Sequence, residues 1–162
     1  MGDRRMNLSK NFTLTELVKS EIALRKGWDN TPGEAEIANL KVLAEKVLQP
    51  VRDHFATGVK VNSGYRSPQL NKEIRGSRNS HHCLGMAADI EIPGFPNYQL
   101  ADWINQNLKF SQVILEFYTQ GDPNSGWVHV SYDPNALKNE ALTAVKDKVN
   151  KNNTVYLPGL RP

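Results

Sequence analysis

An α+β domain with a small, mainly antiparallel sheet flanked by helices is the fold that this sequence predicts. A long segment in the first third of the chain has the spacing of a helix, and four short strand-like segments follow it, separated by turns. The chain has 162 residues, which suits one domain spanning residues 1–162 better than two. Because four short strands cannot close into a barrel, we expect one face of the sheet to stay open.

The start of the chain contains one clear helix signal. Residues 1–11 are polar and are expected to be loose, and residues 28–33 form a turn-rich break. Between them, Thr13 and Glu16 have the spacing of a capping box, in which each side chain bonds to a free backbone N–H group. This arrangement predicts the start of a short helix.

The strongest periodic signal runs from Glu34 to about Phe55. Its apolar positions recur at helical spacing: Ile37, Leu40, Ala44, Val47, Leu48, Val51 and Phe55. Pro50 lies inside this pattern and has no backbone N–H to donate. We therefore expect a kink there, or a helix that ends and resumes.

The second half of the chain mixes strand and helix patterns. Alternating, β-branched segments predict strands at residues 59–63, 87–92, 112–118 and 127–132. A short helix is predicted from Ser67 to Ile74 and a longer one around residues 100–108, while residues 76–86 and 120–126 have the composition of loops. Residues 139–150 are compatible with a late helix, and the role of the tail at residues 135–162 stays open.

Composition limits the classes of function. The net charge is +3 and the Lys and Arg residues are dispersed, so no nucleic-acid partner is expected. The single cysteine, Cys83, excludes an internal disulfide and a zinc site made of several thiolates. No segment has the apolar length of a signal peptide or a membrane span. We expect a monomer that is synthesised in the cytoplasm and has no membrane partner.

Three residues that can bind a metal are placed to meet on the predicted sheet. Side chains alternate between the faces of a strand, so Asp89 and His129 can project side by side from adjacent strands. His82, in the loop before Asp89, can fold over them. Two imidazoles and a carboxylate suit Zn²⁺ and leave a fourth position for water, whose pKa the ion lowers to about 7. The spacing alone is also compatible with a chance arrangement of these residues, in which His129 is an ordinary strand histidine and not a metal ligand.

A longer pattern around these residues resembles a known family. Ser80-x-His82-x-x-Gly85-x-Ala87-x-Asp89, followed by Trp127-x-His129, is similar to the pattern of the D-alanyl-D-alanine carboxypeptidase family of zinc peptidases. That family includes cell-wall carboxypeptidases, vancomycin-resistance dipeptidases and phage endolysins. Residues 61–67 resemble its strand-to-loop element, and the whole match spans about residues 12–134. The resemblance implies that His82, Asp89 and His129 hold one Zn²⁺ on the open face of the sheet.

The resemblance does not settle which group handles protons. Many family members have an acidic residue three positions before the last histidine, where this chain has Gly126. Glu116 and Asp122 are the nearest carboxylates in the sequence. We prefer Glu116, because a carboxylate in the middle of a strand is costly without a partner. An edge-strand glutamate that faces solvent is the alternative, and His81 is a weaker candidate.

Two further residues are expected to act on the substrate. The resemblance implies that Arg66 lies near the zinc, where it polarises the scissile carbonyl or binds a substrate carboxylate. A guanidinium offers the paired donors that both tasks require, although a surface arginine is the alternative. Ser80 is expected either to donate to the substrate or to cap the loop that carries His82.

The function expected from the resemblance is zinc-dependent hydrolysis of peptide bonds in peptidoglycan stem peptides, of the D-Ala-D-Ala carboxypeptidase or endopeptidase type. A protein of this kind without a secretion signal resembles a phage lysis enzyme or virion component that reaches the cell wall by another route. The alternative is a non-catalytic wall-binding or virion-structural module on the same fold. The missing acid at Gly126 keeps that alternative open.

Overall fold

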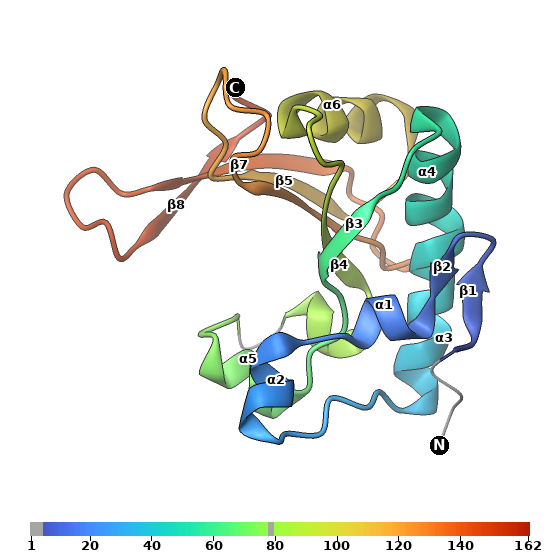
Figure 1. Cartoon of the computed structure of the whole chain (residues 1–162). Helices are drawn as coiled ribbons and strands as arrows, with labels where there is room; N and C mark the ends of the chain where they lie inside the picture. Colours follow the sequence, from blue (N-terminus) through green and yellow to red (C-terminus); the bar gives the residue numbers. More distant parts are fainter. Residues whose placement is uncertain (1–4, 78–79) are drawn as a thin grey trace.

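The computed structural model describes residues 5–77 and 80–162, and a six-stranded sheet lies at its centre (Figure 1). In spatial order the strands are β3 (Lys60–Ser63), β4 (Ala87–Glu91), β6 (Trp127–Ser131), β5 (Gln112–Glu116), β7 (Glu140–Lys146) and β8 (Thr154–Pro158). Neighbouring strands are antiparallel except β5 and β7, which are parallel. The predicted α+β fold with a mainly antiparallel sheet is confirmed, with six strands in place of four.

A two-stranded sheet of β1 (Asn7–Ser9) and β2 (Phe12–Thr13) precedes the first helix. The expectation that residues 1–11 are loose is therefore wrong for residues 7–9, while residues 1–4 lie outside the described residues. Leu8 is 1% exposed and belongs to the main core, which anchors the segment. Leu8 is the only apolar residue of β1, and so short a segment has too little alternation to indicate a strand.

Side-chain caps begin the short helices around the sheet. Before α1 (Leu14–Val18), Thr13 and Glu16 form both hydrogen bonds of the predicted capping box. The predicted short helix is α5 (Pro68–Glu73), which begins after Ser67, whose side chain accepts from the backbone N–H of Leu70. A further helix, α2 (Glu21–Lys26), is not among the predicted elements and is capped by the Ser20 side chain.

One long helical segment consists of α3 (Glu34–Leu43), the π-helical turn η1 (Ala44–Leu48) and α4 (Gln49–Phe55). Pro50 lies in the first turn of α4. The backbone N–H just before it, that of Gln49, bonds to the carbonyl of Ala44, which is the spacing of a π turn. The wider turn lets the helical segment continue past a residue that cannot donate a bond. The expected disturbance at Pro50 is thus a π turn.

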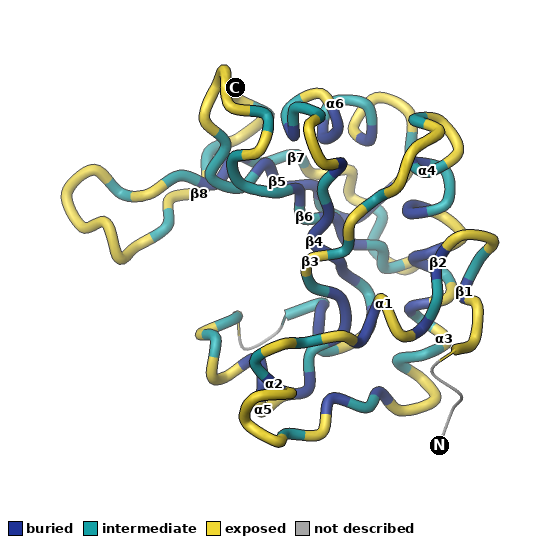
Figure 2. The backbone as a smooth tube through the Cα atoms, in the orientation of Figure 1, coloured by how far each residue is buried: buried dark blue, intermediate teal, exposed yellow. Residues whose placement is uncertain are grey.

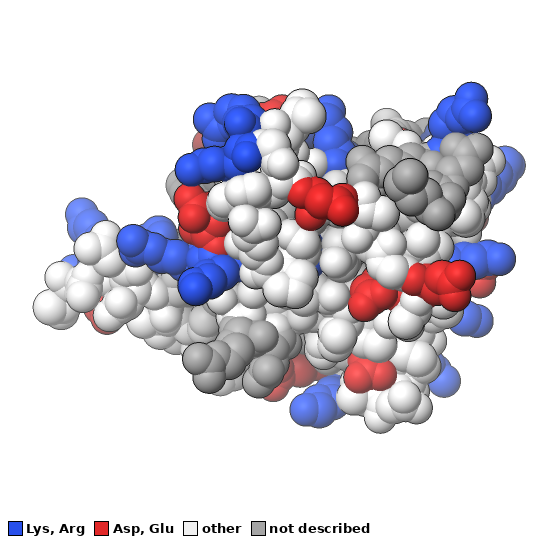
Figure 3. Space-filling view, turned by 90° about the horizontal axis from the view of Figure 1, so that it is seen from below, with Lys and Arg blue, Asp and Glu red and all other residues white. Residues whose placement is uncertain are grey.

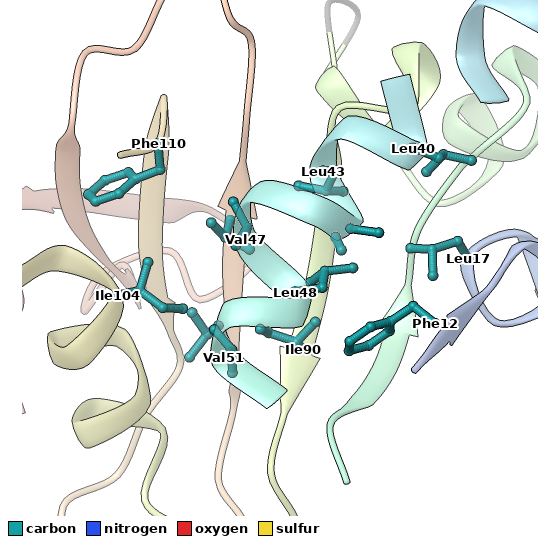
Figure 4. Packing of buried hydrophobic residues seen from close by; sticks show 14 of the residues in the cluster. Phe12, Leu17, Leu40, Leu43, Val47, Leu48, Val51, Ile90, Ile104 and Phe110 are labelled. Carbon is teal, nitrogen blue, oxygen red and sulfur yellow. The ribbon is translucent and has the colours of Figure 1, made fainter. Parts of the chain in front are cut away.

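The core lies between this helical segment and one face of the sheet (Figure 4). The helix α6 (Asn97–Asn107) contributes to the same core. Residues near its centre are Leu43, Val47, Leu48, Val51, Ile90, Ile104 and Phe110. Because these helices pack on one face, the other face of β4, β6 and β5 is available for polar side chains. None of the helices in the described residues is long and apolar enough to cross a membrane.

Residues 139–150 do not form the expected late helix. Residues 140–146 are strand β7, which pairs with β5 on one side and β8 on the other. Val149, near the end of that segment, is 96% exposed beyond the end of β7. Backbone pairing with β5 decides the conformation, and a local pattern cannot contain a partner so remote in sequence. The tail thus becomes a hairpin that extends away from the molecule, with an exposed loop at its tip (Figures 1 and 2).

Candidate metal centre

The open face of the sheet carries a row of side chains at the middle of three strands. Asp89 on β4 pairs with His129 on β6, and His129 pairs with Ile114 on β5. Directly paired residues point to the same face of a sheet. The next residues along β6, Val128 and Val130, are fully buried in the core on the opposite face. The structure therefore brings Asp89 and His129 side by side, as strand alternation predicts.

His82 reaches this row from the 3₁₀ turn η2 (His81–Leu84), which lies just before β4. Its Nε2 atom lies 3.4 Å from Oδ1 of Asp89, and its ring centroid lies 5.1 Å from that of His129. On the other side of the ring, Nδ1 lies 2.8 Å from the carbonyl oxygen of Gly64. Because a carbonyl oxygen only accepts, Nδ1 carries the proton, and Nε2 presents its lone pair to the cluster.

The segment that supplies this carbonyl is held close to α1. A Cβ at Gly64 would collide with the backbone carbonyl of Leu17, so only glycine fits at this approach. The next residue, Tyr65, donates its backbone N–H to the same Leu17 carbonyl at 2.7 Å. The side chain of buried Asn30 donates to the carbonyls of Val18 and Tyr65. These bonds fix the position of the Gly64 carbonyl against His82.

The three side chains fit a zinc ion by donor type and by spacing. Oδ1 of Asp89 lies 3.4 Å from Nε2 of His82 and 3.0 Å from Nδ1 of His129, and one ligand atom from each residue lies within 4.8 Å of the others. Ligands about 2.1 Å from a tetrahedral Zn²⁺ are about 3.4 Å apart, so the observed spacing is of the right size. Three protein ligands leave a fourth position, as in catalytic rather than structural zinc sites.

The protonation states also favour a metal ion. Burial lowers the pKa of His82, so its imidazole is neutral at pH 7. Burial by itself raises the pKa of Asp89, but interactions with His82 and His129 outweigh burial and hold that pKa well below its usual range. Metal ligands must be neutral imidazoles and ionised carboxylates. His82 and Asp89 are in those states at neutral pH.

Arg66 binds the second oxygen of Asp89. Its Nη2 atom lies 3.2 Å from Oδ2 of Asp89, and its other nitrogens donate to Oγ of Ser63 at 3.1 Å and Oδ1 of Asn71 at 3.5 Å. The Arg66 side chain is only 13% exposed, so the expected alternative of a surface arginine is wrong. By engaging Oδ2, Arg66 leaves Oδ1 directed at the two histidines, which is how outer partners orient a metal ligand.

Glu116 lies farther along β5 on the same face, paired with Trp127 of β6. Burial raises the pKa of Glu116 to about 7, and the charge of Asp89 adds to the rise. His129, Trp127 and Arg66 lower the same pKa, but by less. A carboxyl group with a pKa near neutrality can both accept and return a proton at pH 7. The alternative of an edge-strand glutamate is wrong, because β5 lies between β6 and β7.

The backbone accounts for the missing acid at position 126. Gly126 has a φ of 63°, in the left-handed region, and a Cβ there would collide with the backbone carbonyl of Glu116. No side chain fits at this position without moving the turn away from β5. The strand that this turn contacts carries the Glu116 carboxyl group into the same cleft as His82, Asp89 and His129.

The cleft has a volume of about 370 Å³, and both Ser80 and His81 line it. Oγ of Ser80 accepts from the backbone N–H of His82 at 3.2 Å, which is the capping role expected as one of its two alternatives. Burial lowers the pKa of His81. Asp122 is exposed in the turn after β5 and is not among the residues that line the cleft, so it is the weaker choice for proton transfer.

Sequence reasoning did not identify two residues of this cleft region. Asn71 is 6% exposed, accepts from Arg66 and donates to the carbonyl of Ser77, so it helps to hold the guanidinium. Tyr156 of β8 lines the cleft beside Glu116. Tyr156 lies in the tail, where no local signal could have indicated it. Gly64, whose carbonyl contacts His82, lies within residues 61–67, which already resembled the family's strand-to-loop element.

Comparison with protein families agrees with this geometry. The family model described as peptidase M15 matches residues 10–131, which run from just after β1 to the end of β6 and include the three candidate metal-binding side chains. The β7–β8 hairpin lies outside the matched residues. No curated protein matches the chain.

Proposed function

This chain belongs to the peptidase M15 family, the zinc D-Ala-D-Ala carboxypeptidase-type family, and from that premise we propose that it hydrolyses peptide bonds in peptidoglycan stem peptides. The observation that carries the proposal is the convergence of His82, Asp89 and His129 in one cleft with Glu116. The bond cleaved is of the D-Ala-D-Ala carboxypeptidase or endopeptidase type, and stem peptides are the proposed partner.

The metal site consists of Nε2 of His82, Oδ1 of Asp89 and Nδ1 of His129. Zn²⁺ in such a site supplies a Lewis acid for the scissile carbonyl and lowers the pKa of water to about 7. The chain contributes a ligand set whose tautomer and orientation are fixed in advance by Gly64 and Arg66. Fixing the ligands before substrate binds reduces the reorganisation that the reaction requires.

Glu116 is the proposed general base and acid. Its ionised carboxylate accepts a proton from the attacking water while the water oxygen bonds to the carbonyl carbon. The same carboxyl group then gives the proton to the leaving amine as the C–N bond breaks, so it ends the cycle ionised. A pKa near 7 suits a group that must do both, and a step of this kind contributes on the order of 10²-fold or more to the rate.

Arg66 and Ser80 are the proposed substrate-binding residues. Arg66 has five N–H donors and directs three nitrogens at Asp89, Ser63 and Asn71, which leaves N–H groups for a carbonyl or carboxylate oxygen in the cleft. Its fixed position suits stabilisation of the negative charge that develops on the scissile carbonyl. The hydroxyl of Ser80 faces the same cleft and retains a donor after it caps η2.

The cell wall is the proposed place of action, with the protein acting as a phage lysis enzyme or virion component. A net charge of +3 is compatible with an anionic wall polymer but does not identify one. On the face seen in Figure 3, Lys and Arg lie at separate places with Asp and Glu between them, in contrast to a continuous basic patch. This distribution gives no support to a nucleic-acid partner.

Digestion of purified peptidoglycan, with mass spectrometry of the products, tests the proposal. The zinc-loaded protein is expected to release stem-peptide fragments, and one defined muropeptide would identify the bond that is cut. His82→Ala is expected to release none. Tight binding to wall fragments without products from the wild-type protein would overturn the proposal in favour of the non-catalytic wall-binding or virion-structural module.

A further inference from the structure

The C-terminal hairpin brings a tyrosine to the catalytic face of the sheet. Glu116 on β5 pairs with Ala144 on β7, and Ala144 pairs with Tyr156 on β8. Directly paired residues share a face, so Trp127, Glu116, Ala144 and Tyr156 form one row across four strands. Tyr156 therefore lies on the face that carries the metal-binding side chains, although it is outside the family-matched residues 10–131.

Nothing on β7 separates the phenol from the carboxyl group. Ala144 stands between them, is fully buried and ends in a single methyl group. Tyr156 and Glu116 line the same cleft as His82 and His129. Burial raises the pKa of Tyr156, and the charge of Glu116 raises it further. The cleft thus extends from the metal-binding residues to β8.

The phenol is available to a ligand. Tyr156 is 54% exposed, and within the described part of the chain its hydroxyl makes no hydrogen bond. A phenolic O–H can donate to a peptide carbonyl or a carboxylate, and it can also accept from a peptide N–H. The β7–β8 hairpin, which carries Tyr156, extends away from the body of the molecule (Figure 1).

Strand spacing gives the length of peptide that would reach this residue. Adjacent strands are about 4.8 Å apart, so the two steps from β5 to β8 cover about 10 Å. An extended peptide advances about 3.3 Å per residue, so about three residues bridge that distance. A dipeptide cut beside Glu116 ends before it reaches Tyr156, whereas a longer peptide on that side passes across it.

We propose that Tyr156 forms a distal substrate-binding subsite, which hydrogen-bonds the backbone of peptides that extend about three residues beyond the scissile bond. The inference rests on the proposed peptidase function and makes it more specific. The substrate class is then an oligopeptide rather than a free dipeptide. Arg66, next to β3, and Tyr156, on β8, bind the peptide on opposite sides of the metal centre.

The test compares two lengths of one substrate. The bond that the wild-type enzyme cleaves is presented in an end-blocked dipeptide, and in the same sequence extended by three residues on one side or the other. Replacing Tyr156 by Phe removes only the hydroxyl, whose hydrogen bond contributes about 1 kcal/mol, or about fivefold. Tyr156→Phe is expected to lower kcat/KM about fivefold for one extended peptide, mainly by raising KM. For the dipeptide, kcat/KM of the variant should stay within about twofold of the wild-type value.

A matched control and a binding measurement complete the test. Tyr98→Phe removes a hydroxyl from α6, away from the cleft, and should match the wild type on every peptide. Binding of the same peptides to the metal-free protein, followed by tryptophan fluorescence, should show the same preference for the extended peptide and its loss in Tyr156→Phe. The subsite would be overturned if Tyr156→Phe keeps the wild-type ratio of kcat/KM, or of affinity, between the extended peptide and the dipeptide. Failure of the wild type to cleave any peptide would instead count against the proposed function.

Discussion

The carbonyl oxygen of Gly64 lies 2.8 Å from Nδ1 of His82, and this contact fixes which nitrogen of the ring can bind a metal. The two residues come from separate loops and meet because glycine can approach the Leu17 backbone so closely. The contact gives His82 the tautomer with its lone pair on Nε2, the atom that faces Asp89. A backbone contact therefore orients the imidazole of a candidate metal ligand.

Gly64→Ala is expected to weaken zinc binding about 10- to 100-fold, because the Cβ collides with Leu17 and displaces the carbonyl that orients His82. Zinc titration by calorimetry measures the effect. Gly58→Ala is the control, since a Cβ there meets nothing within 4 Å. If the Gly64 variant folds and binds zinc as tightly as the wild type, the carbonyl has no orienting role.

Glu116→Gln is expected to retain zinc and to lower turnover on the order of 10²-fold or more, because an amide cannot take the proton from water. Peptide hydrolysis and metal analysis on the same sample measure both properties. Asp122→Asn, which removes an exposed carboxylate outside the cleft, should leave turnover unchanged. Full turnover in Glu116→Gln would move the proton transfer to another group, such as His81.

The metal-free protein should lose stability as the pH rises through the range in which Glu116 ionises. The pKa of the Glu116 carboxyl rises from its ordinary value of 4.5 to about 7 in the folded chain, so the folded state holds the proton more tightly. Linkage then lowers the free energy of unfolding between those two pH values, by at most about 3 kcal/mol from this group. Glu116→Gln removes this dependence and should be more stable than the wild type at pH 8.

Thermal unfolding of both metal-free proteins at pH 4.5 and pH 8 measures the difference. Asp89 acts in a separate range, because its pKa is lowered in the folded state and its contribution to stability is lost progressively as the pH falls below about 4. If the difference in melting temperature between wild type and Glu116→Gln is the same at both pH values, the Glu116 carboxyl is not buried as described.

Gly126→Ala is expected to destabilise the protein by about 2 to 4 kcal/mol, since it combines a positive φ with a collision against the Glu116 backbone. Gly121→Ala isolates the first effect, because Gly121 has a φ of 90° and open space around its Cβ. Chemical denaturation of both variants gives the difference. If Gly126→Ala and Gly121→Ala lower the free energy of unfolding equally, the contact between the turn and β5 is absent.

The parts of the fold that the sequence predicts are those with local causes. The capping box at Thr13, the helix start at Ser67 and the alternation around Asp89 each depend on residues within a few positions of one another. That Asp89 and His129 can lie side by side was also predictable, because side chains alternate between the two faces of each strand.

The features that the sequence did not predict depend on residues that are distant in the chain. β7 forms because it pairs with β5, and its own residues fit a helix equally well. Tyr156 enters the cleft only through that pairing, so no pattern near residue 156 could indicate it. The contact between Arg66 and Asp89 likewise depends on the fold, although the resemblance had placed Arg66 near the metal.

Calorimetric titration with Zn²⁺ tests the central claim most directly. The wild-type chain is expected to bind one ion, and His82→Ala and His129→Ala are each expected to lose more than about 100-fold in affinity. His54→Ala should bind as the wild type does, because His54 stacks on Trp103 with ring centroids 4.4 Å apart, away from the cleft. Undiminished zinc affinity in His82→Ala and His129→Ala, or no zinc binding by the wild type, would contradict the account.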